Sequence, residues 1–309
     1  MLLTRQMDME FSRQDFELVR CNLCGADSAR KSMKIDGFWV VRCSRCGLAY
    51  VNPRLREGAL HRIYNKEYYS NTAFKGSKAT FYGYGEYIKD EKDIKATFRR
   101  RLDSIGKFSK AGNLLDIGCA VGFFLETAQE RGWKAQGLEL SRFAYRYAKR
   151  RKLQVINKTL EQARFREGTF DAVSIFDVIE HLPNPKGTLK EINRVLRKGG
   201  IIAVTTPNIG SLVARILGKR WEEVRRVREH IYFFSEETLR KMLESAGFEV
   251  VKVESAGRYF SVHSAIERGK LYSKPLFSFL GIFADAFSAR NKKIYVDPHY
   301  KMTIYARKK

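Results

Sequence analysis

The chain has 309 residues and carries 58 Lys and Arg against 34 Asp and Glu, a formal net charge of +24. Its hydrophobic fraction of 44% is large enough for a sizeable core, which argues against a globally disordered chain. The positive charge favours anionic partners, namely nucleic acid, a membrane surface or a phosphorylated small molecule, and does not choose among them. No run of about eighteen apolar residues and no signal-peptide core occurs, so we expect a cytoplasmic protein without a membrane span.

Two Cys-x-x-Cys pairs dominate the first part of the chain. Cys21 and Cys24 form one pair, Cys43 and Cys46 form the other, and the spacing between the pairs is typical of a four-cysteine zinc ribbon. Four thiolates can close a tetrahedral shell around a structural ion. Two disulfides are the alternative, and the lack of a secretory signal argues against them. We therefore expect residues 1–58 to form a zinc-ribbon module.

Residues 59–110 are expected to connect this module to the rest of the chain. Tyrosine, phenylalanine and lysine are interleaved over residues 64–87, a composition that suits stacking on sugars or bases. The same composition equally suits a linker whose rings pack on the main domain. Residues 90–108 have the apolar periodicity of a helix.

Residues 111–309 alternate short apolar runs with helical patterns, which predicts an α/β, doubly wound Rossmann-like domain with a mostly parallel sheet. The expected strands are 113–118, 133–139, 153–157, 170–176, 201–206, 248–255 and an antiparallel last strand, 300–306. The expected helices are 122–131, 141–151, 184–197 and one that starts at Ser235. Ligands bind such sheets at the carboxyl ends of the strands.

A glycine turn follows the first of these strands. Gly118 and Gly122 bracket it, and a helix begins directly afterwards, so backbone N–H groups can hold a nucleotide-like ligand. Glu139 ends the next strand, where a carboxylate can grip a ribose diol. The candidate binding residues of these two segments are Asp116, Gly118, Cys119, Ala120, Gly122, Glu139 and Leu140.

The stretch Asp116-Ile-Gly-Cys-Ala-Val-Gly122, followed by Glu139, resembles the class I S-adenosylmethionine-dependent methyltransferases, whose motif is an acid and then Gly-x-Gly-x-Gly. The dinucleotide fingerprint fits worse, because Ala120 and Phe123 stand where its second and third glycines would be. Ala120 also departs from the methyltransferase pattern, and its methyl leaves less room for the ligand. The resemblance implies S-adenosylmethionine as methyl donor, with its methionine part in the glycine turn and its ribose on Glu139.

The segment after the strand at 170–176 is similar to the ubiquinone-biosynthesis type of methyltransferase, in which Asp/Glu-x-x-Glu-His recurs. Phe176 and Asp177 are expected to close the methyl-transfer face. Asp177, Glu180 and His181 could hold Mg²⁺ or a transition ion. His181 alone could act as a general base, because an unperturbed histidine titrates near neutrality. The alternative is that Glu180 and His181 only cap a helix and line the donor pocket.

Two insertions are expected on the acceptor side, 209–230 and 262–296. The first is basic, and its arginines suit a diphosphate. It ends at His230, a second candidate base that could equally be a packing residue. The second contains an apolar helical face at 276–287, flanked by lysines, which could lie in a membrane interface. We favour packing of this face on its own domain or on a dimer partner.

The order of zinc ribbon, connector and donor-binding core looks like that of bacterial methyltransferases of surface-polysaccharide and sugar-nucleotide pathways. This resemblance implies an anionic small-molecule acceptor, such as a sugar nucleotide or a glycan precursor. Two alternatives remain: an RNA methyltransferase that uses the ribbon and the basic surface, and a non-catalytic S-adenosylmethionine-binding module. The choice among O-, C- and N-methylation and the oligomeric state stay open.

Overall fold

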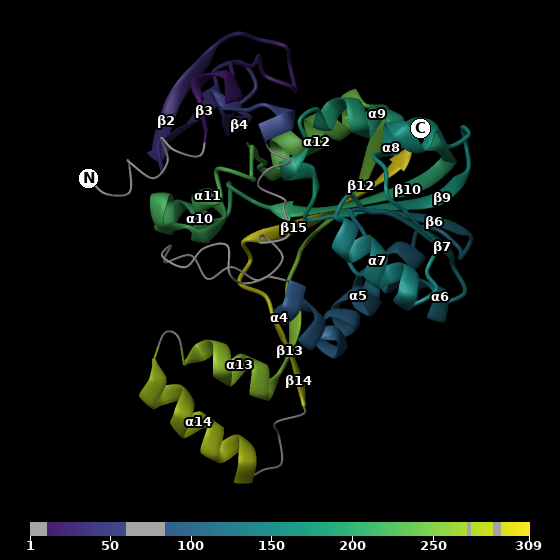
Figure 1. The fold of residues 1–309 in the computed structure, drawn as a ribbon, viewed down its shortest axis with the longest axis vertical. Coiled ribbons are helices and arrows are strands. Elements are labelled where there is room, and N and C mark those ends of the chain that lie inside the picture. The colour runs from purple at the N-terminus through teal and green to yellow at the C-terminus, as the bar shows by residue number, and fades with distance from the viewer. Residues whose placement is uncertain (1–10, 60–83, 271–272, 287–291) are drawn as a thin grey trace.

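A computed structural model describes residues 11–59, 84–270, 273–286 and 292–309 of the chain (Figure 1). Residues 64–83, which contain most of the predicted aromatic connector, lie outside the described part. A seven-stranded central sheet and a four-stranded N-terminal sheet organise the described residues. Within the described residues, no helix combines the length and the apolar character needed to cross a bilayer.

The central sheet has the strand order β12-β15-β10-β9-β6-β7-β8. Its strands pair in parallel except for β15, which runs antiparallel to both of its neighbours. This arrangement confirms the predicted mostly parallel, doubly wound sheet with an antiparallel last strand. The strands are β6 (Asn113–Ile117), β7 (Lys134–Leu138), β8 (Val155–Ile156), β9 (Phe170–Phe176), β10 (Leu196–Pro207), β12 (Phe248–Ser255) and β15 (Lys301–Lys308).

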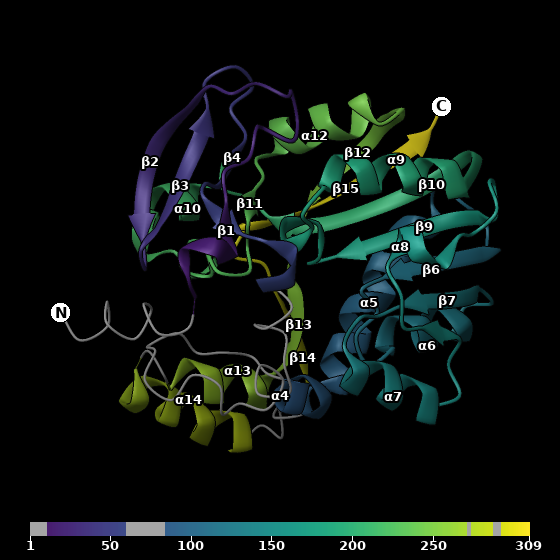
Figure 2. The ribbon, with the colours of Figure 1, turned by 45° about the horizontal axis from the view of Figure 1, so that its top comes forward.

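Helices cover both faces of the central sheet (Figures 1 and 2). One layer contains α5 (Glu91–Gly106), α6 (Phe123–Glu130) and α7 (Arg142–Arg150), and the other contains α8 (Leu160–Ala163), α9 (Pro185–Val195) and α12 (Glu236–Ser245). Local sequence explains where these helices begin. The Ser141 hydroxyl caps α7, and Ser235 forms a capping box at the start of α12.

The N-terminal sheet is completed by a strand that is distant in the sequence. Its order is β11-β4-β3-β2, and β11 (Tyr232–Phe233) pairs antiparallel with β4 (Ala49–Val51). The Arg54 guanidinium also donates to the Pro183 carbonyl oxygen at 2.8 Å and to the Tyr232 hydroxyl at 3.0 Å. The sheet is therefore not built from residues 1–58 alone. Its remaining elements are η1 (Arg13–Asp15), β2 (Ala29–Ile35), β3 (Phe38–Cys43) and the separate pair β1 (Phe16–Glu17) and β5 (Arg54–Leu55).

The structure differs from the sequence prediction at three places. Strand β10 begins at Leu196, not at residue 201, because Leu196 already pairs with Phe170 before a shift in register. Strand β8 contains only Val155 and Ile156. A two-stranded ribbon of β13 (Arg258–Ser261) and β14 (Lys293–Val296) had not been predicted.

The two predicted insertions are largely helical. Residues 209–230 contain α10 (Leu212–Leu217), η3 (Gly218–Arg220) and α11 (Glu222–Arg225). Residues 262–296 contain α13 (Val262–Gly269), α14 (Lys274–Ala286) and β14. The lobe formed by β13, α13, α14 and β14 projects away from the central sheet (Figure 1). The remaining elements are α4 (Tyr84–Lys89) and η2 (Ile179–His181).

Candidate active site

The glycine turn joins β6 to α6 and needs glycine at both of its ends. Gly118 and Gly122 have φ angles of 73° and 92°, in the region that side chains disfavour. A Cβ atom on Gly118 would also lie 2.5 Å from Cγ2 of Val178, in the segment after β9. Gly122 is the N-cap of α6, so the turn brings the amino end of a helix to the carboxyl edge of the sheet.

Glu139 follows β7 and connects the glycine turn to the next loop. Its Oε2 accepts a hydrogen bond from the Ala120 N–H at 2.9 Å, and its Oε1 accepts one from the Ser141 N–H at 2.7 Å. The side chain is 8% exposed, and burial raises the pKa of the carboxyl. Ala120 itself has a φ of 49°, so this position imposes backbone strain besides the loss of space expected from its methyl. Each carboxylate oxygen retains a second lone pair that can accept from a hydroxyl.

The other predicted donor-site residues surround this turn in different ways. Asp116 is buried on β6 and accepts from the Ser174 hydroxyl at 2.7 Å, and burial raises its pKa to about 7. Cys119 is 4% exposed and packs near Gly137. Leu140 is 52% exposed.

Phe176 ends β9 and contributes its ring to an aromatic cluster. The ring stacks on Phe98 with centroids 6.1 Å apart and meets Phe124 edge-on at 5.1 Å. The Arg101 guanidinium lies 4.8 Å from the centroid of the Phe176 ring. These contacts hold the ring against α5 and α6.

Asp177 lies at the turn after β9, with a φ of 56°, and pairs with a lysine from the antiparallel strand β15. The Lys301 ammonium is 2.8 Å from its Oδ1. Burial alone would raise the pKa of Asp177, but this ammonium and the guanidinium groups of Arg101 and Arg226 together outweigh burial and hold the pKa below its usual value. Nζ of Lys301 also lies 3.8 Å from Oε1 of Glu223, a residue of the first insertion. Lys301 therefore links the donor edge to the acceptor-side insertion.

Replacing Lys301 by Met is expected to lower the free energy of unfolding at pH 7 by about 1 kcal/mol. The effect is small because 38% of the Asp177 side chain is exposed, so water screens the pair. The stabilisation by the pair is present above the ordinary aspartate pKa of about 4 and is lost as pH falls through the lowered pKa of Asp177. Urea unfolding of wild type and variant at pH 7 and at pH 3 measures the stabilisation by this pair. The difference in the free energy of unfolding between Lys301→Met and wild type should be smaller at pH 3 than at pH 7. An exposed control, Lys219→Met, should leave the free energy of unfolding unchanged at both pH values. A difference that is equal at both pH values would contradict the role of the pair.

Glu180, His181 and His230 come together beside this pair. One ligand atom from each of these side chains lies within 4.8 Å of the others. Oε2 of Glu180 accepts from the Thr206 hydroxyl at 2.9 Å, and the two imidazole centroids are 4.6 Å apart. Nδ1 of His181 lies 3.0 Å from the Glu229 carbonyl oxygen, which fixes a tautomer with its proton on Nδ1 and its lone pair on Nε2.

This cluster is largely buried, with His181 partly exposed, and it is uncharged at neutral pH. Burial lowers the pKa of His181 to about 4 and moves that of His230 well below its usual value. Burial and the nearby Asp177 raise the pKa of Glu180 to about 8. The expectation that His181 titrates near neutrality is therefore wrong, because a desolvated imidazole resists protonation. His181 can still accept a proton as the acceptor reacts, as a weaker base.

The predicted Mg²⁺ site at Asp177, Glu180 and His181 has no support in this arrangement. Asp177 is already paired with the Lys301 ammonium and is not a member of the trio that the structure gathers. Two imidazoles and one carboxylate suit zinc or iron better than Mg²⁺, which prefers oxygen ligands.

Two residues of this site, Lys301 and Glu223, were not predicted from the sequence. Glu223 is 6% exposed, and its Oε2 has no hydrogen-bond partner among the residues that the structure describes, while it lies 3.6 Å from Nδ1 of His230. The start of an antiparallel strand lies at the same edge as the ends of its parallel neighbours, and this rule could have marked Lys301. One arginine assigned to a diphosphate, Arg226, pairs instead with Oε1 of Glu229 at 2.7 Å.

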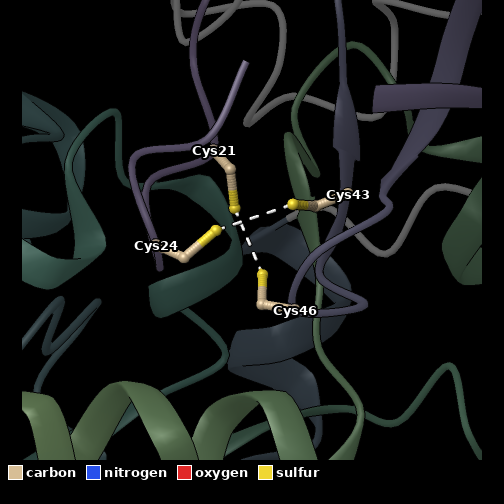
Figure 3. A group of neighbouring side chains, drawn as sticks. All are labelled: Cys21, Cys24, Cys43 and Cys46. Carbon is tan, nitrogen blue, oxygen red and sulfur yellow. Dashed lines mark hydrogen bonds between the residues drawn. The ribbon is translucent and has the colours of Figure 1, made fainter. Parts of the chain in front are cut away.

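The four cysteines of the N-terminal sheet form a second cluster (Figure 3). Sγ of Cys21 lies 3.4 Å from Sγ of Cys46, and Sγ of Cys24 lies 3.6 Å from Sγ of Cys43. All four sulfur atoms lie within 4.8 Å of one another, and none is in a disulfide. This geometry is consistent with a zinc ribbon.

The parallel sheet, the glycine turn and the acid after the second strand together define a Rossmann-like S-adenosylmethionine-dependent methyltransferase. The family model of the methyltransferase domain matches residues 89–253, more than half of the chain, and the chain belongs to this family.

Two curated relatives are similar to parts of the chain. The uncharacterized protein MJ1123 of Methanocaldococcus jannaschii is 28% identical over 173 residues, which are 54% of this chain and 79% of that protein. The ubiquinone biosynthesis O-methyltransferase of Dechloromonas aromatica is 32% identical over 117 residues, 35% of this chain and 50% of that enzyme. The match with the second relative thus spans half of its length.

Two solved structures are similar to the chain at low sequence identity. A chain of the complex between the Trm112 methyltransferase activator and a methyltransferase from Haloferax volcanii has a TM-score of 0.50 and 15% identity, and the match covers 72% of this chain and 94% of that one. A methyltransferase from Archaeoglobus fulgidus has a TM-score of 0.49 and 21% identity, and the match covers 72% and 99%. These likenesses concern the fold alone.

Proposed function

We propose that this methyltransferase transfers a methyl group to a small, anionic acceptor related to a sugar, a sugar nucleotide or a glycan precursor. The observation that carries the proposal is the cluster of the buried Glu180 and His230 with the partly buried His181. It follows the donor motif at the carboxyl edge of the sheet and is joined to the insertion 209–230 through Glu229. A buried polar cluster of this size suits one small polar molecule better than an extended nucleic acid.

On the donor side, the proposal assigns the methionine part of S-adenosylmethionine to the turn from Asp116 to Gly122. Glu139 accepts from the ribose hydroxyls while it keeps its bonds to the backbone of Ala120 and Ser141. The sulfonium is a good leaving group, so most of the rate enhancement comes from holding the acceptor in line with the methyl.

On the acceptor side, the proposed base is His181, with His230 as its neighbour. The carbonyl of Glu229 accepts from Nδ1 of His181, so Nε2 is the basic nitrogen of this ring and the atom that takes the acceptor proton in this proposal. Glu180, whose raised pKa keeps it protonated near neutrality, can donate a hydrogen bond to the acceptor. Exposed cations of the insertion, Arg220 and Arg225, can attract an anionic acceptor.

We further propose that Cys21, Cys24, Cys43 and Cys46 hold one structural zinc ion, since four thiolates leave no ligand position for a substrate. Purified protein is expected to contain about one zinc per chain. Cys24→Ser should lose this zinc and destabilise the N-terminal sheet, while S-adenosylmethionine affinity changes little. Metal analysis and calorimetry check this. Zinc-free wild-type protein with four reactive thiols would contradict the assignment, and Cys119→Ser is the control that should keep its zinc.

Labelled S-adenosylmethionine and a cell extract test the acceptor class. Label is expected in the sugar-nucleotide or glycan-precursor pool. Label in RNA, together with RNA binding that weakens steeply with salt, would favour the RNA methyltransferase and overturn the proposal. Donor binding without label in any pool would favour the non-catalytic module.

A further inference from the structure

The short helix α10 of the first insertion presents apolar side chains to solvent. Leu212 is 71% exposed, Ile216 is 73% exposed and Leu217 is 43% exposed. Only Ala214 of this helix is buried. Single exposed apolar residues are common on protein surfaces, but three of them on six consecutive positions make a contiguous patch.

Cations surround this patch and acids do not. Arg215, Lys219 and Arg220 are exposed, and no Asp or Glu occurs from Ile209 to Trp221. Within the described residues, none of these three cations forms an ion pair. Apolar side chains with unpaired cations among them are typical of segments that lie in the interface of an anionic membrane.

Helix α14 of the projecting lobe presents a second apolar face. Gly281 is buried against Ile266 of α13, which defines the face of α14 that packs on its own lobe. At about 100° per residue, Leu276 and Leu280 lie about 140° and 100° away from Gly281 around the helix. They are 53% and 42% exposed. The side opposite α13 is therefore apolar and in contact with water, while the Gly281 side packs within its own lobe.

Helices α10 and α14 are about sixty residues apart in the sequence but lie on the same side of the molecule in both views (Figures 1 and 2). We propose that α10 and α14 dock this protein on the surface of an anionic lipid bilayer, without crossing it. The two helices are too short to span a bilayer, which needs about 20 residues. This inference goes beyond the methyl-transfer proposal and does not depend on the identity of the acceptor.

Charge favours a lipid surface over a second copy of the chain as the occupant of this side. A second copy would carry the same net charge of +24 and would place its own Arg215, Lys219 and Arg220 near those of the first. Like charges in one interface oppose association. Anionic headgroups instead neutralise these cations, while the acyl boundary takes the leucine and isoleucine side chains.

Sedimentation of the full chain with vesicles tests the proposal. The probes are phosphatidylcholine vesicles with and without phosphatidylglycerol. We expect binding only to the vesicles with phosphatidylglycerol, and weaker binding at high salt. The double variants Leu212→Ser/Ile216→Ser and Lys219→Glu/Arg220→Glu should each weaken binding about ten-fold or more. Leu276→Ser/Leu280→Ser should weaken it too.

Two matched controls test whether vesicle binding depends on this surface or on any exposed apolar or basic side chain. Leu18→Ser removes an apolar side chain that is 81% exposed on the N-terminal part of the chain. Lys149→Glu/Arg150→Glu reverses two exposed cations on α7. Both control variants should bind vesicles like wild type, and unchanged S-adenosylmethionine affinity shows that each variant is folded.

Equal binding to both kinds of vesicle, or no binding to either, would overturn the proposal. It would also fail if analytical ultracentrifugation showed a wild-type dimer that Leu212→Ser/Ile216→Ser converts to a monomer, since the patch would then be an interface between two copies. Vesicle binding that the controls weaken as much as the test variants do would show that the charge of the whole chain, not this side, is responsible.

Discussion

His181→Ala is expected to lower turnover by about a hundred-fold or more while the affinity for S-adenosylmethionine stays within a few-fold. The Glu229 carbonyl orients the ring, and the cluster with Glu180 and His230 includes no residue of the donor turn. Removal of the imidazole therefore removes proton transfer and acceptor positioning but leaves the donor contacts of Glu139. Single-turnover rates with the identified acceptor, together with calorimetry for the donor, separate the two effects.

The pH dependence gives a second test of the same residue. A base must be unprotonated, and burial lowers the pKa of His181 to about 4. At saturating S-adenosylmethionine, the acid limb of kcat/KM for the acceptor is therefore expected near pH 4, below the value of about 6.5 for an ordinary histidine. His299→Ala is a suitable control, since 77% of that side chain is exposed. Full activity of His181→Ala would contradict the proposed base and leave His181 as a lining residue of the pocket.

The parts of the site that local sequence encodes could be predicted. The glycine turn needs Gly118 and Gly122 because of their positive φ angles, and such positions are visible in the sequence of a single strand–turn–helix unit. The position of Glu139 could be predicted in the same way, because this residue directly follows the next strand, β7. The four cysteines were equally predictable, since two knuckles of fixed spacing bring four sulfur atoms together.

The parts that depend on distant segments could not be predicted. Lys301 reaches Asp177 only because β15 inserts between β10 and β12, an order that no local pattern specifies. Glu223 reaches His230 through the fold of the insertion. The two residues of β11 are too few for a strand pattern, and their pairing with β4 arises from tertiary contacts.

The pKa of His181 was predicted wrongly for a related reason. Residue type sets the ordinary pKa, but the shift depends on what surrounds the side chain. His181 and His230 lie against each other within a buried cluster, so the cost of desolvation exceeds the attraction of nearby carboxylates such as Glu229. Sequence alone gives the order of these residues and not their burial.

Glu139→Ala is expected to weaken S-adenosylmethionine binding by about ten- to a hundred-fold, because a hydrogen bond to a charged group is worth roughly 1.5–3 kcal/mol. The variant loses the acceptor for the ribose hydroxyls. It also frees the Ala120 and Ser141 N–H groups that the carboxylate holds at 2.9 Å and 2.7 Å, so the turn becomes less well ordered before the donor arrives. Isothermal titration calorimetry with S-adenosylmethionine measures the effect.

The matched control is Glu130→Ala, which removes a carboxylate that is 47% exposed at the far end of α6 and should leave donor affinity unchanged. The pH dependence adds a check on the mechanism. Burial raises the pKa of Glu139, and only the ionised carboxylate accepts through both oxygens, so wild-type affinity should decrease as pH falls toward that raised pKa. The affinity of Glu139→Ala should lack this dependence. Equal affinities of wild type and Glu139→Ala at neutral pH would remove Glu139 from the donor site, and the ribose would then have to be held by the backbone of the turn alone.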